Sequence, residues 1–298
     1  MTNRFTMQFV ATEEMLLREA IAKWGISKRA LTSIKFNGGG IFVNDIEQNV
    51  RYQLMPGDRV KIIFPAEEVS EGLVPQFGHL TIVYEDDALL VIDKPAYMST
   101  IPSREHPDSS VANFVCGYLQ KQGLASTVHI VTRLDRDTSG LMCIAKHRHI
   151  HHLMSEAQKR GDVQRQYEAI VYGAVQSQSI IAPIGRKDTS IIEREVRADG
   201  QFAHTDVTLL EYVTIGNKVL SHIRLKLHTG RTHQIRVHMA HIGHPLVGDA
   251  LYGGDKELID RHALHCVSLS FEHPLTREQL SFSSALPSSL NKLINNIE

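Results

Sequence analysis

The stretch Val131-Thr132-Arg133-Leu134-Asp135-Arg136-Asp137-Thr138-Ser139-Gly140 connects two segments with the composition of β-strands, residues 129–131 and 141–145. It predicts a strand, a turn and a second strand, with Asp135 placed in the turn between two arginines. Neighbouring positive charge stabilises an ionised carboxylate, which a nucleophile or a general base requires. Asp, Thr and Ser in a turn also commonly bond only their own backbone, so these ten residues alone favour a purely structural role.

Strands outnumber helices in the apolar pattern on both sides of this turn. One amphipathic helix is predicted at residues 147–159, where four apolar side chains recur on one side. Because long helices do not alternate with the strands, the pattern favours an α+β fold with a mostly antiparallel, mixed sheet over a doubly wound fold. The predicted strands cover residues 80–84, 88–92, 129–131, 141–145, 167–172, 207–212, 219–227, 234–238 and 269–271.

Composition divides the chain into a small domain at residues 1–66, an acidic linker at 67–79 and a larger domain at 80–298. The linker contains proline, glycine and three glutamates, and it has no periodic apolar pattern. The small domain predicts a helix at residues 13–23 and a second helix at 28–35, with Ser27 as its N-cap. Strands are predicted to follow at residues 41–45 and 59–64.

The distribution of charge changes what the net charge implies. The 298 residues carry a formal charge of −1, from 32 Lys and Arg against 33 Asp and Glu, which at first argues against a nucleic-acid partner. Counted by segment, the net charge is +3 over residues 1–64, −6 over 65–92 and +2 over 93–298. An acidic segment therefore masks two mildly basic ones. Residues 224–247 hold four basic residues, five histidines and no acid, so an RNA partner remains compatible with the sequence.

Several classes of protein find no support in the sequence. No run of about 18 apolar residues predicts a membrane span, and the first residues lack the apolar stretch of a secretory signal. The three cysteines lie far apart, which predicts neither a disulfide framework nor a closely spaced metal pair and favours a reducing cytoplasm. No glycine-rich phosphate-binding pattern occurs, so no nucleotide cofactor is expected.

Four ordered motifs resemble those of pseudouridine synthases of the RluA type. Arg133-Leu134-Asp135-x-x-Thr138-Ser139-Gly140 is similar to the catalytic motif of that family. Arg165-Gln166-Tyr167-Glu168-Ala169 resembles its basic-x-Tyr-x-Ala element, and residues 229–238, continued by 243–253, resemble its most recognisable stretch. Lys94-Pro95 matches the start of the family's catalytic domain, and residues 264–274 match its end. The resemblance spans roughly residues 80–285 and implies the fold and the reaction of the family.

Three positions depart from the family pattern. Thr132 stands where the family usually has His before the arginine of the catalytic motif. Tyr97 replaces the usual Gly that follows Lys-Pro, and Ile101-Pro102 replaces a frequent His-Pro. None of these changes removes the carboxylate of Asp135 or its expected partners.

The order of elements in residues 1–66 resembles the S-four RNA-binding domain, named after a ribosomal protein of the small subunit. The matching features are the Ser-Lys-Arg helix start, the Val43-Asn44 pair and the Pro56-Gly57-Asp58 turn. In that family the basic side of the two helices contacts RNA phosphates. The resemblance implies that Lys28, Arg29 and Lys35 position an RNA backbone.

The resemblance to the synthases implies isomerisation of uridine in RNA to pseudouridine. The bond from the anomeric carbon of the sugar to the ring nitrogen breaks, the uracil turns, and it rejoins the sugar through carbon five. Because no redox change or hydrolysis occurs, neither a metal nor an organic cofactor is expected. Asp135 is implied as the essential carboxylate, either as a nucleophile on the anomeric carbon or as a base that gives a glycal.

The resemblance also assigns roles to five further residues. Arg236 pairs with Asp135, for which an arginine fork suits better than a lysine. Tyr167 stacks on the target base and is a candidate for the proton transfer at carbon five, and Arg133 fills the space of the flipped nucleotide. Arg231 and His233 are implied to hold phosphates or the loop of the active site.

Other interpretations stay open on the sequence alone. The fold could serve a catalytically silent RNA-binding or ribosome-assembly protein, although the set of Asp135, Tyr167 and Arg236 argues against it. The histidines of residues 147–152 and 238–244 could be the ligands of a metal-dependent hydrolase, but they lack the converging Cys or carboxylate partners of such sites. Large-subunit ribosomal RNA is the favoured substrate, transfer RNA is the alternative, and a monomer is the expectation for this family.

Overall fold

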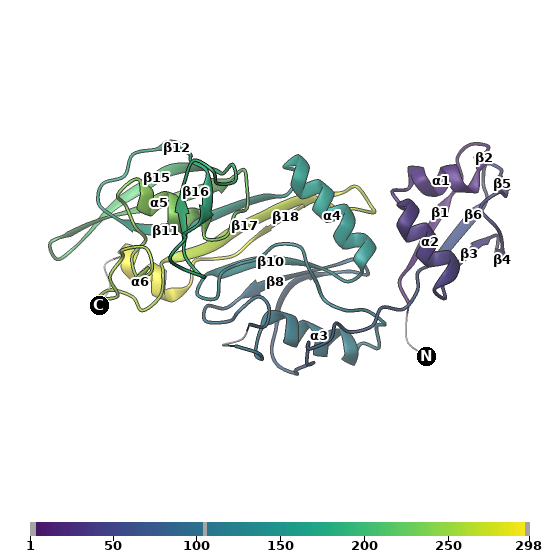
Figure 1. Ribbon diagram of the computed structural model, residues 1–298, viewed down its shortest axis with the longest axis horizontal. Helices are drawn as coiled ribbons and strands as arrows, with labels where there is room; N and C mark the ends of the chain where they lie inside the picture. Colours follow the sequence, from purple (N-terminus) through teal and green to yellow (C-terminus); the bar gives the residue numbers. More distant parts are fainter. Residues whose placement is uncertain (1–3, 104–105, 296–298) are drawn as a thin grey trace.

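The computed structural model of the protein describes residues 4–103 and 106–295. These residues form a four-stranded sheet near the N-terminus and a ten-stranded sheet that uses strands from residue 81 to residue 283; the two sheets share no strand. The smaller sheet and its helices lie at one end of the molecule (Figure 1, purple). This arrangement is a mixed, mostly antiparallel α+β architecture, as the sequence predicted.

The smaller sheet has the strand order β1-β6-β3-β4, with every pair antiparallel. Two helices pack on it, and the side chain of Ser27 accepts the amide hydrogen of Ala30, which confirms the predicted N-cap. Its core contains Leu17, Ile34 and Ile62, all fully buried. The elements are β1 (Thr6–Val10), β2 (Met15–Leu16), α1 (Leu17–Lys23), α2 (Lys28–Phe36), β3 (Gly40–Val43), β4 (Ile46–Glu47), β5 (Gln53–Leu54) and β6 (Arg59–Ile63).

The first helix is shorter than predicted. It begins at Leu17 rather than at Glu13, because Met15 and Leu16 pair with Leu54 and Gln53 in a two-stranded ladder. Strand β1 was not predicted at all. It pairs along its whole length with β6, so its structure depends on a partner more than 50 residues away in the chain.

The larger sheet has the order β12-β15-β16-β11-β17-β10-β8-β7, with β18 and β9 attached to β17 and β10. Every pair is antiparallel except β10 with β17, which pair in parallel at Ser139–His265 and Gly140–Cys266. The strands are β7 (Thr81–Glu85), β8 (Leu89–Lys94), β9 (His129–Ile130), β10 (Ser139–Ala145), β11 (Gln164–Tyr172), β12 (Gln178–Ile181), β15 (His204–Ile215), β16 (Lys218–Leu227), β17 (Leu264–Glu272) and β18 (Gln279–Ser283). A separate hairpin is made by β13 (Ile184–Arg186) and β14 (Arg194–Val196).

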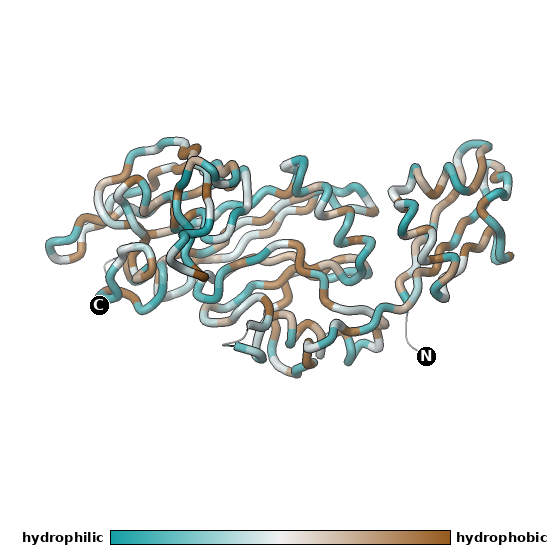
Figure 2. The backbone as a smooth tube through the Cα atoms, in the orientation of Figure 1, coloured by the Kyte–Doolittle hydropathy of each residue, from teal (hydrophilic) through white to brown (hydrophobic). Residues whose placement is uncertain are grey.

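Helices cover both faces of the sheet around β8 and β10. Figure 1 shows α3 (Val111–Lys121) and α4 (Arg148–Arg160) on either side of these strands. Residues 139–145 are buried without alternation, as expected for a strand that is covered on both faces. Figure 2 accordingly shows hydrophobic colour along the central strands, and polar colour on the outer loops.

The predicted strand at residues 234–238 is wrong. These residues form the helix α5 (Gln234–His241), which follows His233 in a left-handed backbone conformation with φ of 57°. The helix is buried on all sides from Gln234 to Met239, so its sequence lacks the one-sided apolar pattern of a surface helix. Ile235 and Val237, both β-branched, then imitate the alternation of a strand. Two further helices, α3 and α6 (Ser288–Asn295), were not predicted.

Residues 65–79 contain no helix or strand, as predicted, but they are not a solvated linker. The carboxylate of Glu67 is nearly buried, with 9% of its side chain exposed, and lies 2.6 Å from His129 Nε2 and 3.4 Å from His147 Nε2. Further along, Gln76 donates its amide hydrogen to the Asn113 carbonyl of α3. The rings of Phe5 and Phe64 pack against His147, which immediately precedes α4. The connecting segment is therefore held against the larger sheet and its helices.

Each helix in the described residues is too short or too polar to cross a lipid bilayer.

Candidate active site

A cavity of about 980 Å³ opens where the turn between β9 and β10, the strand β11 and the start of α5 meet. Asp135, Tyr167 and Arg236 all line it, although they lie on three separate elements. The sheet thus brings together the three residues whose roles the family resemblance implied. The other polar side chains at its wall include Arg133, Arg165, Arg194, Arg231 and His233.

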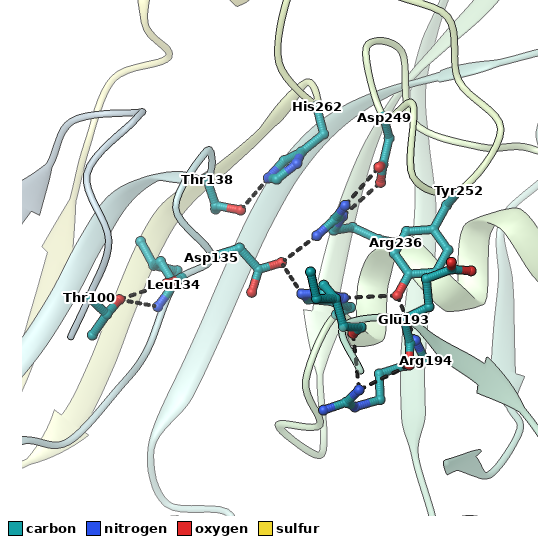
Figure 3. Close-up of polar contacts among 12 residues, drawn as sticks. Thr100, Leu134, Asp135, Thr138, Glu193, Arg194, Arg236, Asp249, Tyr252 and His262 are labelled. Carbon is teal, nitrogen blue, oxygen red and sulfur yellow. Dashed lines mark hydrogen bonds and ion pairs between the residues drawn. The ribbon is translucent and has the colours of Figure 1, made fainter. Parts of the chain in front are cut away.

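The turn that carries Asp135 is tied to its surroundings by hydrogen bonds on both sides. Thr100 Oγ bonds the backbone of Leu134, accepting its amide hydrogen at 3.3 Å and donating to its carbonyl at 2.6 Å. The carbonyl of Arg136 accepts from Lys94 Nζ at 3.1 Å, and Thr138 Oγ lies 2.7 Å from His262 Nε2 (Figure 3). These contacts fix the direction of the Asp135 side chain, which lies among them.

Lys94 is completely buried beneath this turn. Its Nζ also donates to the carbonyls of Pro95 and Met98, each at 2.8 Å. Burial lowers the pKa of Lys94 to about 7, while the nearby carboxylates of Asp135 and Asp137 act in the opposite direction. Lys94 therefore ties three loop carbonyls together under the site, a role that its place in the Lys-Pro motif did not reveal.

Asp135 pairs with Arg236, and Arg236 is itself held by Asp249. Arg236 Nη1 donates to Asp135 Oδ2 at 3.1 Å. The Nε and Nη2 atoms of Arg236 donate to the two oxygens of Asp249 at 2.7 and 2.8 Å. The ring of Tyr252 lies under the guanidinium, 4.9 Å from ring centroid to Cζ, so the arginine is fixed on every side (Figure 3).

The surroundings of Asp135 favour its charged form. Burial by itself raises the pKa of this carboxyl, but the positive charge around it outweighs burial and holds the pKa below its ordinary value. Burial lowers the pKa of His233 and takes that of His262 to about 4, so both rings are neutral near pH 7. The permanent charge that stabilises the Asp135 carboxylate is therefore that of Arg236.

His233 approaches the same carboxylate from the other side. Its Nε2 lies 3.8 Å from Asp135 Oδ2, and its Nδ1 lies 2.8 Å from the hydroxyl oxygen of Tyr252. The Tyr252 oxygen in turn accepts the amide hydrogen of Arg194, at the start of β14, at 2.9 Å. His233 thus lies in the site itself rather than on a phosphate-binding surface.

Tyr167 is buried in the cavity wall on β11. A β-bulge between Gln166 and Tyr167 shifts the pairing with β17 at this point. Burial raises the pKa of Tyr167 well above its usual range, and the neighbouring Cys266 contributes in the same direction. The phenol is therefore protonated at neutral pH and offers an aromatic face and a hydrogen-bond donor.

The basic residues of the site lie around the mouth of the cavity. Arg133 is exposed there, and Arg231 donates through Nε to the carbonyl of Phe202 at 2.9 Å. A second cavity of about 450 Å³ adjoins the first and shares Arg133, Arg194 and Arg231 with it. Lys28, Arg29 and Lys35 line neither cavity; they are exposed on α2, which packs on the smaller sheet.

Two of the histidines singled out in the sequence make structural contacts. His238 bonds Thr205 and the carbonyl of Ala182, and His244 bonds the carbonyl of Tyr172. Within residues 4–103 and 106–295, the one group whose geometry could hold a metal is His204, Asp206 and His228. Its atoms already satisfy one another, because the Asp206 oxygens lie 3.1 Å from His204 Nε2 and 2.6 Å from His228 Nε2. His204 and Asp206 lie in β15 and His228 directly follows β16, so spacing along the sequence did not reveal the group.

The three departures from the family pattern have structural counterparts at two positions. Thr132 is buried, and its hydroxyl accepts the amide hydrogen of Cys143 at 2.9 Å, so it fastens the turn to β10. Tyr97 has φ of 65°, the left-handed conformation that glycine adopts without strain, and its hydroxyl bonds Asp260. Nothing in the structure explains the replacement at Ile101.

Comparisons with known proteins give the family. The model of the RNA pseudouridylate synthase family matches residues 88–241. The chain is 51% identical over 282 residues, 94% of its length and 98% of the relative's, to the uncharacterized RNA pseudouridine synthase YjbO of Bacillus subtilis. It is 36% identical over 268 residues to the ribosomal large subunit pseudouridine synthase D of Vibrio cholerae, covering 85% of this chain and 81% of the other.

A solved structure agrees with these matches. The human RNA pseudouridylate synthase domain containing 1 is 25% identical and superposes with a TM-score of 0.59, covering 75% of this chain and 89% of that one. The family model covers more than half of the chain, and its matched region includes Asp135, Tyr167 and Arg236. The chain therefore belongs to the RNA pseudouridylate synthase family, as its motifs indicated, and is an isomerase that acts on RNA.

Proposed function

We propose that the protein converts uridines of large-subunit ribosomal RNA to pseudouridine, with Asp135 as the essential carboxylate. The observation that carries this proposal is the contact of Asp135 with Arg236 beside Tyr167 in one cavity. The choice of RNA rests on the relatives named ribosomal large subunit pseudouridine synthase D, from Vibrio cholerae and from Escherichia coli, which match over most of their length.

Asp135 acts in its ionised form. Attack on the anomeric carbon and removal of a sugar proton both need a carboxylate, and Arg236 supplies the charge that keeps Asp135 in this state. The two bonds from Asp249 leave only Nη1 of Arg236 facing Asp135. Arg236 therefore orients the carboxylate of Asp135 and also stabilises its ionised form. A mobile lysine would not orient it in this way.

Tyr167 stacks on the uracil that enters the cavity. Its buried ring gives a flat apolar surface for a base that has left its own stack. Because burial raises the pKa of its hydroxyl, Tyr167 does not serve as an anionic base in the free enzyme. To take the proton from carbon five, this hydroxyl must first transfer its own proton to an oxygen of the bound uracil, because a neutral phenol cannot hold a second proton.

The RNA backbone follows the arginines at the mouth of the two adjoining cavities. Arg133 and Arg231 belong to both cavities and are close to the turn that carries Asp135. Arg133 is exposed at the rim, where its side chain fills the space that a flipped nucleotide leaves. Unstacking costs a few kcal/mol and costs least in loops and single strands, so such regions are the preferred substrates.

Residues 1–66 act as an S-four-like RNA-binding domain, residues 67–79 as a connector and residues 80–298 as the catalytic domain. Lys28, Arg29 and Lys35 are exposed on α2 and available to phosphates. The buried contacts of Glu67 with His129 and His147 hold the connector against the catalytic domain. This position lets the N-terminal domain select the RNA region while the cavity selects the base. The enzyme works as a monomer in the cytoplasm without a metal or an organic cofactor.

Two alternatives define the controls for a test. The same reaction on transfer RNA uses the same cavity, and a catalytically silent RNA-binding protein keeps the fold but performs no isomerisation. The test measures release of tritium from RNA labelled at uracil carbon five, with large-subunit ribosomal RNA and transfer RNA as separate substrates. The wild type is expected to release tritium from ribosomal RNA, and Asp135→Asn is expected to release none.

The outcomes separate the alternatives. Tritium release from transfer RNA alone contradicts the proposed substrate but keeps the proposed chemistry. No release from either RNA by the wild type overturns the enzymatic proposal and favours the silent RNA-binding protein. Mapping pseudouridines in ribosomal RNA from cells with and without the gene then identifies the modified positions.

A further inference from the structure

Four groups form a continuous polar chain from the hairpin β13–β14 to the carboxylate of Asp135. The amide of Arg194 donates to the Tyr252 oxygen at 2.9 Å, and this oxygen lies 2.8 Å from His233 Nδ1. On the far side of the same ring, His233 Nε2 lies 3.8 Å from Asp135 Oδ2. Figure 3 shows Tyr252 and Arg194 on the side of Arg236 that faces away from the Asp135 turn.

The bonds of Tyr252 decide where its hydroxyl proton lies. A phenol has one proton to donate, and the amide of Arg194 already donates to the oxygen. Among the described residues, His233 Nδ1 is the only acceptor within hydrogen-bond distance of this hydroxyl. Tyr252 is partly buried, and a partly buried hydroxyl that does not donate gives up a hydrogen bond, so Tyr252 donates to Nδ1.

This bond fixes the tautomer of His233. If Nδ1 accepts, the proton of the neutral imidazole lies on Nε2, the nitrogen that faces Asp135. The ring is neutral near pH 7, because burial lowers the pKa of His233. Asp135 therefore faces one permanent cation, Arg236, and one neutral N–H donor.

The backbone supports the same geometry. His233 has φ of 57°, an unusual conformation for a residue other than glycine, and its carbonyl accepts from Val237 in the first turn of α5. Such a conformation costs about 1 kcal/mol and persists where the surroundings impose it. Here it directs the ring between Tyr252 and Asp135.

We infer that Tyr252 is a positioning residue, which holds His233 in the tautomer that presents an Nε2–H donor to Asp135. This inference rests on the proposed function of Asp135. The 3.8 Å separation exceeds a hydrogen bond, and a shift of about 1 Å on RNA binding brings the donor within range. The carboxylate then keeps its charge and its orientation without a second cation, which would make it a weaker nucleophile or base.

The chain also connects Asp135 with the RNA-binding surface. Arg194 lines both cavities and begins strand β14, whose backbone the Tyr252 hydroxyl bonds directly. RNA that contacts the hairpin therefore acts on the atom that orients His233. Tyr252 thus couples occupation of the cavity mouth to the arrangement of the reacting carboxylate.

The test begins with the free wild-type protein labelled with ¹⁵N-histidine. The ring nitrogens of His233, assigned by their loss in His233→Gln, are expected to show a protonated Nε2 and a hydrogen-bonded, unprotonated Nδ1. In Tyr252→Phe the Nδ1 resonance is expected to move to that of a nitrogen without a hydrogen bond. A protonated Nδ1 in the wild type overturns the inference, and this reading needs no RNA and no activity.

Kinetics then test the positioning role. Tyr252→Phe keeps the ring under Arg236 and is expected to lower kcat about tenfold with KM within about twofold, the size of one lost hydrogen bond. The matched control is Tyr118→Phe in α3, which loses a comparable hydroxyl bond to Glu85 at the end of β7. This variant is expected to keep wild-type kcat. Unchanged kcat in Tyr252→Phe contradicts the role.

A double variant identifies the route. If Tyr252 acts through His233, then His233→Gln with Tyr252→Phe is no slower than His233→Gln alone. If the losses in kcat of the two single variants multiply in the double variant, the inference is overturned. A wild type that isomerises no RNA contradicts the proposed function instead, and the nitrogen spectra distinguish this failure from a failure of the Tyr252–His233 contact.

Discussion

Asp249 accepts hydrogen bonds from Nε and Nη2 of Arg236 through its two carboxylate oxygens, at 2.7 and 2.8 Å. This arrangement leaves Nη1 of the guanidinium for the contact with Asp135. Both side chains of this inner pair are buried, with exposed fractions of 9% for Arg236 and 1% for Asp249. The outer contact to Asp135 is longer, at 3.1 Å, and its carboxylate is more exposed, at 29%. The ion pair between Asp249 and Arg236 is thus the more rigid one, and the Asp135 carboxylate remains accessible for reaction with substrate.

Replacing Asp249 by Asn is therefore expected to lower activity without removing any group that touches substrate. The variant loses a charge-assisted, bidentate contact worth about 1.5–3 kcal/mol, which corresponds to a loss of about 10- to 100-fold in kcat. RNA affinity is expected to stay within about threefold, because the rim arginines are untouched. Tritium release and RNA binding are measured on the same preparation.

Asp255→Asn is the matched control for Asp249→Asn. Its carboxylate accepts from Tyr172 and from Lys218 at the surface, where an ion pair contributes little. This variant is expected to keep wild-type kcat. An Asp249→Asn enzyme with wild-type kcat would show that Arg236 needs no second carboxylate to orient Asp135.

Gly140 ends the catalytic motif at a point where a side chain has no room. Its φ is 112°, and an added Cβ would lie 2.3 Å from the carbonyl oxygen of Cys266 on the parallel strand β17. Gly140→Ala is expected to destabilise the fold by about 3 kcal/mol or more, through strain and overpacking together. Gly123 has φ of 70° with no atom within 4 Å of the added Cβ, so Gly123→Ala measures the strain alone, about 1 kcal/mol.

Urea unfolding followed by circular dichroism compares the two alanine variants. The difference between them combines the contact of Gly140 with Cys266 and the greater backbone strain at φ of 112° than at φ of 70°. Equal losses of stability in the two variants would mean that β10 and β17 separate readily at this point. The motif glycine would then serve backbone conformation alone.

Motif order predicted which residues line one cavity, whereas the local apolar pattern predicted less of the fold. The order of four motifs sufficed to bring together Asp135, Tyr167 and Arg236, because the family that carries those motifs has one arrangement. The pairing of Asp249 with Arg236 was not predictable, because both residues lie in matched stretches that say nothing about which side chains meet.

The failures in the fold have a physical cause in each case. Residues 234–238 alternate like a strand, but α5 is buried on all sides, so burial does not impose a helical period on its sequence. Strand β1 is set by its long-range partner β6 and has no turn signal of its own. Glu67 was interpreted as part of an acidic linker, since its histidine partners lie more than 60 residues further along the chain.

The protein is expected to lose stability in mild acid, because His147 and His149 at the start of α4 are buried in their neutral form. Burial lowers the pKa values of His147 and His149 to about 4, from an ordinary 6.5. As the pH falls from 6.5 to 4, these histidines take up protons in the unfolded chain but not in the folded chain. Protonation therefore favours the unfolded chain, and the free energy of unfolding decreases. A shift of this size corresponds to about 3 kcal/mol for each ring.

His149→Leu tests this expectation, since the Nε2 of His149 has no hydrogen-bond partner among the described residues and its ring stacks on Phe64. Unfolding is followed by the fluorescence of Trp24, the single tryptophan, which stacks on Phe9 in the smaller sheet. The variant is expected to lose less stability than the wild type between pH 6.5 and 4. Parallel curves for the two proteins would exclude His149 as a source of the pH dependence.

The salt dependence of RNA binding tests the N-terminal domain separately from the active site. Lys28, Arg29 and Lys35 are exposed on α2 and far in the fold from the cavity that holds Asp135. Replacing all three by Gln is expected to reduce the slope of log affinity against log salt by about 2, because each phosphate contact contributes about 0.7 on single-stranded RNA. The rate of tritium release at saturating RNA is expected to remain that of the wild type.

Lys121→Gln, at the exposed end of α3, gives the effect of losing a surface charge that faces no proposed RNA path. Filter binding between 50 and 300 mM salt supplies the slopes for each protein. An unchanged slope in the triple variant would mean that RNA does not contact α2, and that the rim arginines around Arg133 and Arg231 account for the electrostatic part of binding. Because net charge is nearly zero, a measurable slope in the wild type must come from such local clusters.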